Sequence, residues 1–137
     1  MNEDPLVASE PLTFQVRISP GYAVVAVAGE IDAGTESRFR DALTSVLSRG
    51  VLRLIVDLSG VVFMASAGIG VLMGVRRVLL DSDGQLALAA PHGEVAQVLK
   101  LTGVSEVIPV APNVPAAVSA LSELPDLDDL TDLSCLK

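Results

Sequence analysis

Residues 12–18 show the simplest pattern in the chain, because apolar and polar side chains alternate along them. A two-residue period is typical of a β-strand with one face toward solvent. Ser19-Pro20-Gly21 supplies a turn, and residues 22–28 follow as a nearly continuous apolar run. Such a run predicts a strand that is buried on both faces. We therefore expect a hairpin whose second strand lies inside a sheet.

Beyond residue 32 the chain alternates between helical and strand-like patterns. The helical segments carry apolar residues on one face, and the segments between them are short apolar runs. A strand that follows a helix predicts a parallel crossover. We therefore expect an α/β fold in one domain, with a mixed sheet of about five strands and about four helices. The expected strands are residues 12–18, 22–28, 53–58, 85–90 and 107–108, and the expected helices are residues 35–48, 67–80, 91–100 and 113–121.

One uncharged stretch, residues 58–75, reaches the lower edge of membrane-span length. Ser59-Gly60 indicates a turn inside this stretch, which would divide the preceding strand from a later helix. We therefore interpret the stretch as buried core and expect no membrane insertion.

Composition narrows the class of function. Half of the 137 residues are hydrophobic and 19% are charged, which suits one domain with a buried core and excludes general disorder. A net charge of −8 with few aromatic residues argues against a nucleic-acid partner. One cysteine, Cys135, and one histidine, His92, cannot form a structural zinc site. The acidic N-terminus is unlike a signal peptide, so we expect a cytoplasmic protein.

The two ends of the chain differ from the middle. Residues 1–11 are polar and without period, so we expect a flexible N-terminal extension. Residues 12–122 form the expected domain. Residues 123–137 contain five acids and one base, which is half of the net charge. Leucines repeat every three residues in this tail, so a short amphipathic helix and a solvated acidic tail both remain open.

Ser66 lies directly before the second expected helix. A serine at this position caps the free N–H groups of the first turn. A helix N-terminus also receives a phosphate well, because it carries partial positive charge and unpaired donors. The helix that follows has no charged residue through Val75. Its second face is therefore covered by a neighbouring helix or left as a binding surface for a partner.

Other chemistry is weakly supported. Ser66 and His92 could act as nucleophile and base, but no feature of the sequence brings them together. Glu30, Asp32 and Asp57 lie near strand ends and could form a weak magnesium site, although such acids more often cap helices or face solvent. We expect no catalytic residue, no metal and no cofactor.

Three motifs, in their order along the chain, resemble the STAS domain of bacterial anti-sigma factor antagonists. The resemblance covers Leu12 to Leu121. The motifs are Gly29-Glu30-Ile31-Asp32, Leu54-Ile55-Val56-Asp57-Leu58-Ser59-Gly60-Val61 and Phe63-Met64-Ala65-Ser66-Ala67-Gly68-Ile69-Gly70-Val71-Leu72.

This resemblance implies a binding protein that is switched by phosphorylation. The unmodified form binds an anti-sigma factor with serine kinase activity and so releases a sigma factor. The kinase then phosphorylates Ser66, and a serine phosphatase reverses the modification. The residues expected to contact the partner are Glu30, Asp32, Ala65, Ser66, Ala67, Gly68, Ile69, Gly70, Val71 and Met73.

One departure from the family pattern supports an alternative. Antagonists usually carry Asp-Ser-Ser or Asp-Ser-Thr where this chain has Ala65-Ser66-Ala67. The alternative is a STAS scaffold subunit of a signalling or lipid-transport assembly, in which Ser66 is not phosphorylated.

Overall fold

Five strands form one mixed sheet in the computed structural model, which describes residues 12–123 of the chain. The order in the sheet is the order in the chain; the first two strands are antiparallel and the other neighbours are parallel. This confirms the expected fold class. The strands are β1 (Thr13–Ser19), β2 (Tyr22–Ile31), β3 (Arg53–Met64), β4 (Gln85–Ala89) and β5 (Val110–Ala111). The helices are α1 (Glu36–Leu47), α2 (Ser66–Asp81), α3 (Gly93–Leu101), α4 (Val104–Val107) and α5 (Val114–Glu123).

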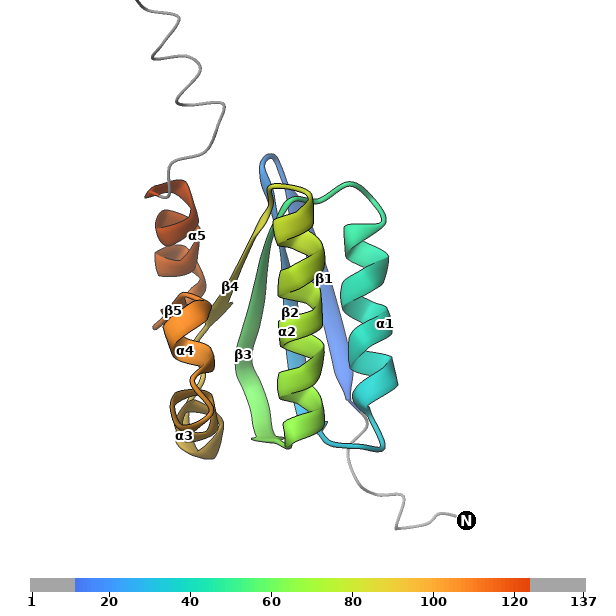
Figure 1. The fold of residues 1–137 in the computed structure, drawn as a ribbon, viewed down its shortest axis with the longest axis vertical. Helices are drawn as coiled ribbons and strands as arrows, with labels where there is room; N and C mark the ends of the chain where they lie inside the picture. Colours follow the sequence, from blue (N-terminus) through green and yellow to red (C-terminus); the bar gives the residue numbers. More distant parts are fainter. Residues whose placement is uncertain (1–11, 124–137) are drawn as a thin grey trace, which may run out of the picture.

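Helices cover both faces of the sheet (Figure 1). α1 and α2 lie side by side on one face, and their apolar residues share one core cluster with β1 to β4, α3 and α4. Phe39 of α1 and Leu72 of α2 are fully buried in this cluster. On the other face, Ala117 and Leu121 of α5 pack against Ile55 and neighbouring residues in a second cluster. The sheet is therefore packed on both faces, which fixes the positions at which its parallel strands end.

Ser59 and Gly60 lie inside β3, so the turn expected at this position is wrong. The strand continues to Met64 because Gly60 permits a close approach to β2. A Cβ at this position would lie 2.8 Å from the Cβ of Ala28. The β2–β3 pairing shifts register between Ala26 and Ala28, and a glycine inside a strand often marks such an irregularity.

The last strand lies further along the chain than residues 107–108. Val107 ends the short helix α4, in which Val104 is buried, and β5 begins only at Val110. Pro109 has no N–H to donate, but its carbonyl accepts a hydrogen bond from the N–H of Leu88 at 2.9 Å. The strand expected at residues 107–108 is therefore wrong, because Val107 belongs to a helix and the strand follows Pro109. The helix expected at residues 113–121 is confirmed, and Asn113 caps it, since its Oδ1 accepts the N–H of Ala116 at 2.8 Å.

The acidic tail lies outside the described residues, apart from Glu123 at the end of α5. Because residues 12–121 already form two apolar clusters, we expect removal of residues 125–137 to lower the melting temperature by less than about 5 °C. A shift of that size corresponds to about 1 kcal/mol in a domain of this length. Thermal unfolding followed by circular dichroism checks this expectation. A larger drop would show that the tail leucines pack against the domain.

Candidate partner-binding site around Ser66

Ser66 is the first residue of α2, directly after the end of β3. The residue before it, Ala65, has extended backbone angles of φ −89° and ψ 173°. Its N–H donates to the carbonyl of Ile31 at 2.8 Å, and its carbonyl accepts the N–H of Gly68 at 2.9 Å. The junction is thus tied both to the end of β2 and to the first turn of the helix.

The hydroxyl of Ser66 is not a helix cap, contrary to the structural role considered for it. The cap position belongs to Ala65, and no side chain hydrogen-bonds to this helix end. The helix begins one residue earlier than expected, so Ser66 has helical backbone and an exposed side chain. The first-turn N–H groups therefore lack a side-chain acceptor, and the serine is accessible to a partner.

Ser66 lies on the exposed side of α2 together with Gly70 and Gly74. These residues are four apart, a spacing that places them on one helix face. A Cβ added to either glycine would meet nothing within 4 Å, so packing inside the domain does not require glycine there. Glycine in a helix interior costs roughly 0.5–1 kcal/mol relative to alanine. The result is an exposed helix face with almost no side chains.

The opposite side of α2 faces the core. Val71 is only 4% exposed and Gly68 is buried, so the expectation that these two contact a partner directly is corrected. A Cβ on Gly68 would lie 2.7 Å from Cγ2 of Ile31. Ile69 and Met73 are partly buried and pack against the core. Although α2 has no charged residue through Val75, α1 and the sheet cover only one part of it, and the remainder is exposed.

The two acids expected in the site have different surroundings. Glu30 is exposed near the end of β2 and lies opposite Phe63 of β3. Asp32 is half-buried, and its Oδ1 accepts the N–H groups of Gly34 at 2.9 Å and Thr35 at 3.1 Å. Asp32 therefore holds the loop that leads into α1, whereas Glu30 is open to a partner.

Two exposed apolar residues near Ser66 were missed from the sequence. Val62 is 60% exposed and Phe63 is 40% exposed, at the end of β3. They belong to an unbroken apolar run that ends in the buried residue Met64. Strand alternation alone would expose only one of these two neighbours, and both are exposed where the β2–β3 register shifts between Gly29 and Glu30. We call Val62, Phe63, Ser66, Gly70 and Gly74 the Ser66 surface.

The other polar candidates serve the local structure. Asp57 Oδ1 accepts the N–H of Ser59 at 3.0 Å, and His92 Nε2 lies 2.9 Å from the carbonyl oxygen of Ser59. His92 thus contacts β3 backbone, and no described hydrogen bond joins it to Ser66. Between residues 12 and 123, no group of three metal-binding side chains could hold an ion. Nor is any helix in that part long and apolar enough to cross a membrane.

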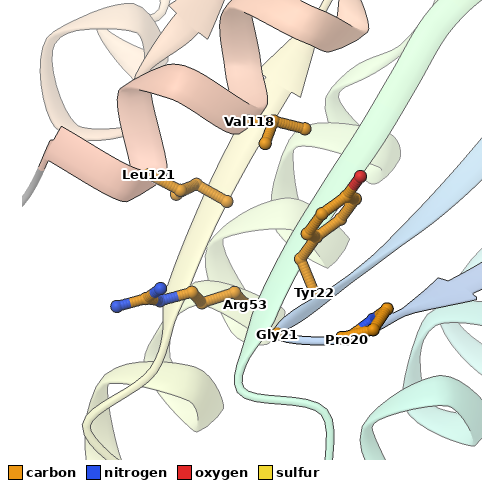
Figure 2. A pocket seen from close by; sticks show the side chains of 6 residues that line it. All are labelled: Pro20, Gly21, Tyr22, Arg53, Val118 and Leu121. Carbon is orange, nitrogen blue, oxygen red and sulfur yellow. The ribbon is translucent and has the colours of Figure 1, made fainter. Parts of the chain in front are cut away.

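A cavity of about 150 Å³ lies between α5 and the start of the sheet (Figure 2). Tyr22 and Arg53, the first residues of β2 and β3, line it together with Val118 and Leu121 of α5. Ser66 follows the other end of β3, so this cavity is separate from the Ser66 surface.

The chain is similar in sequence to a known domain family and to individual members of it. Residues 13–117 match the model of the STAS domain family. The chain is 33% identical to an anti-sigma-B factor antagonist of Listeria monocytogenes over 82 residues, which are 60% of this chain and 72% of that protein.

Solved structures show the same similarity. An anti-sigma factor antagonist from Mycobacterium paratuberculosis superposes with a TM-score of 0.77 at 29% identity, over 84% of this chain and 99% of that one. The Bacillus cell fate determinant SpoIIAA in its phosphorylated form superposes with a TM-score of 0.62 at 22% identity, over 79% of this chain and 98% of that one.

Proposed function

Because the chain belongs to the STAS domain family, we propose that it is an anti-sigma factor antagonist that binds through the Ser66 surface. In this proposal the unmodified chain binds an anti-sigma factor with serine kinase activity, and a sigma factor is released. Phosphorylation of Ser66 ends the interaction, and a serine phosphatase restores it. The chain acts in this cycle by binding and has no catalytic residue of its own.

The observation that carries the proposal is the exposed serine at the start of an uncovered helix face. Val62 and Phe63 offer apolar area within four residues of Ser66, and burial of such area is the main source of affinity in protein interfaces. Gly70 and Gly74 leave space for a partner backbone to approach α2 closely. The relatives named as antagonists support the same class of partner.

A phosphate on Ser66 is compatible with the folded domain. The group would lie at an uncapped helix N-terminus, where partial positive charge favours an anion by typically 0.3–1 kcal/mol. SpoIIAA, which shares the fold, has been solved in a phosphorylated form. The same group would oppose binding, because an apolar interface would have to desolvate about 1.5–2 negative charges.

The sequence Ala65-Ser66-Ala67 favours a second candidate, a STAS scaffold subunit that is never phosphorylated. The two candidates differ in one reaction. The antagonist gains one phosphate on Ser66 when it is incubated with ATP and its partner kinase, and the scaffold gains none. Mass spectrometry of the intact chain and of its Ser66 peptide distinguishes them.

The function is tested by adding the purified chain to the complex of its anti-sigma factor with the sigma factor. We expect free sigma factor and a new complex of this chain with the anti-sigma factor, resolved by size-exclusion chromatography. Retention of the original complex at excess chain would reject the antagonist role. Binding of the anti-sigma factor without release of the sigma factor would support the scaffold candidate instead.

A substitution on the strand end tests where the partner binds. We expect Phe63→Glu to weaken binding of the anti-sigma factor about tenfold, which is about 1.4 kcal/mol, because it places a charge in an apolar contact. Phe63 is partly exposed, so the domain should still fold. Isothermal titration calorimetry measures the affinity.

Leu52→Glu is the matched control for this substitution. Leu52 is also exposed and apolar, but it precedes the start of β3. It should bind as the unmodified chain does. Equal losses for the two variants would mean that the partner does not bind at the Ser66 end of the sheet.

A further inference from the structure

β1 is the edge strand of the sheet, and no strand among residues 12–123 pairs with its outer side. The β1–β2 register is regular over its whole length, without the bulges that often protect an edge. β1 also contains no proline, acid or lysine. An uncovered edge strand of this kind is a template for pairing with another strand.

The turn of the hairpin fixes which backbone groups face outward. Pro20-Gly21 is a two-residue turn, with Gly21 at φ +90°, and it is closed by Ser19 and Tyr22. The residues that close such a turn form a hydrogen-bonded pair, and this state alternates along an antiparallel ladder. The odd-numbered residues of β1 therefore bond to β2, and the even-numbered residues direct their N–H and C=O groups outward.

Observed contacts agree with this alternation. The carbonyl of Leu12, which has the same parity, accepts a hydrogen bond from the side chain of Arg38. The next outward residues are Phe14, Val16 and Ile18, whose backbone groups have no described partner outside the hairpin. These three residues could form a short ladder of backbone hydrogen bonds with a strand of another chain.

The side chains of these residues also lack full cover. Val16 is 45% exposed and Ile18 is 48% exposed, and Phe14 is only partly buried. The other face of β1 carries Gln15 and Arg17. The edge is thus apolar on one face and polar, with a single charge, on the other.

We propose that β1 joins two copies of this chain, which pair antiparallel about a two-fold axis at Val16. In this register Val16 faces Val16 of the second copy, and Phe14 faces its Ile18. All outward backbone groups then meet outward groups. Arg17 faces Gln15 of the second copy, so like charges are not opposed. β1 is thus complementary to a second copy of itself, and because it contains no acid, the negative charges of the two copies lie outside the pairing.

The oligomeric state of the full chain tests the proposal. We expect light scattering after size-exclusion chromatography to give twice the 14.2 kDa chain mass as the concentration is raised. Val16→Arg places two like charges opposite each other and should raise the dissociation constant more than about tenfold. Leu101→Arg, on an exposed residue of α3, should leave it unchanged. A monomer at all concentrations would overturn the proposal.

Cross-linking tests the register independently of variant stability. In a Cys135→Ser background, Val16→Cys should form a disulfide between copies, because the paired Cα atoms would lie about 5.5 Å apart. Ile18→Cys should not, since its two copies would lie about 14 Å apart along the ladder. Equal cross-linking of the two variants would overturn the register. Dimers that form only after removal of residues 1–11 would show that the chain's own N-terminal segment covers the edge, which rejects the proposal for the full chain.

Discussion

Phosphorylated Ser66 is expected to lower the affinity for the anti-sigma factor at least about 100-fold, which is about 2.7 kcal/mol. The serine lies on the exposed face of α2 beside Gly70, where a partner that approaches the helix closely would have to enclose the phosphate. Desolvating its charge in an apolar contact costs several kcal/mol unless a basic group compensates. The melting temperature should change little, because the helix N-terminus favours an anion. Calorimetric titration of the modified and unmodified chains measures the difference.

Substitutions separate the phosphate effect from damage to the surface. Ser66→Ala should take up no phosphate and bind as the unmodified chain does. Ser66→Glu should bind more weakly, though less so than the phosphorylated chain because it carries less charge. Ser105→Glu, at an exposed serine of α4, is the matched control and should bind normally. Equal affinity of the phosphorylated and unmodified chains would reject the switch and favour the scaffold.

Ala65 tests the kinase step separately from binding. Antagonists with the usual pattern carry an acid before the serine, and this chain has alanine there. Ala65→Asp should therefore speed phosphorylation of Ser66 without changing the affinity of the unmodified chain. The rate of phosphate incorporation from labelled ATP measures the first effect. If Ser66 takes up no phosphate even in this variant, the chain is not a substrate of that kinase.

The fold was largely predictable because its core elements have clear periods. β1 alternates between apolar and polar side chains, and α1 has one apolar face that buries Phe39 and Leu43. The errors lie where local signals compete with tertiary contacts. Ser59-Gly60 resembles a turn, yet the close approach of β2 keeps it inside β3. Sequence alone does not show which strand a glycine adjoins.

The site was only partly predictable for the same reason. Ser66 was identified by its place before a helix and by its motif, and both are local properties. The exposure of Val62 and Phe63 depends on how β3 ends against β2, which the sequence does not show. Likewise, the apolar composition of α2 left open which glycines face the core. Only the packing distinguishes Gly68 from Gly70.

These two glycines give opposite expected results for the same substitution. Gly68→Ala would place a Cβ 2.7 Å from buried Ile31 and 2.9 Å from Met64. Overpacking of this kind costs about 1–3 kcal/mol, which exceeds the gain of about 1 kcal/mol from removing a helical glycine. Gly70→Ala meets nothing within 4 Å and should stabilise the domain by roughly 0.5–1 kcal/mol. Chemical denaturation of both variants measures the difference, expected to be about 2 kcal/mol.

If the partner lies close against α2, Gly70→Ala should weaken binding even though it stabilises the domain. Gly70→Ala is more stable but should bind the anti-sigma factor about tenfold more weakly, because the new methyl group lies where the partner backbone approaches. Val78→Ala, at an exposed residue about two turns further along α2, is the control for a change of side-chain size on this helix. A Gly70→Ala variant with full affinity would show that no close approach occurs at this glycine. The partner contact would then rest on Val62, Phe63 and Ser66, and the two exposed glycines would have no role in it.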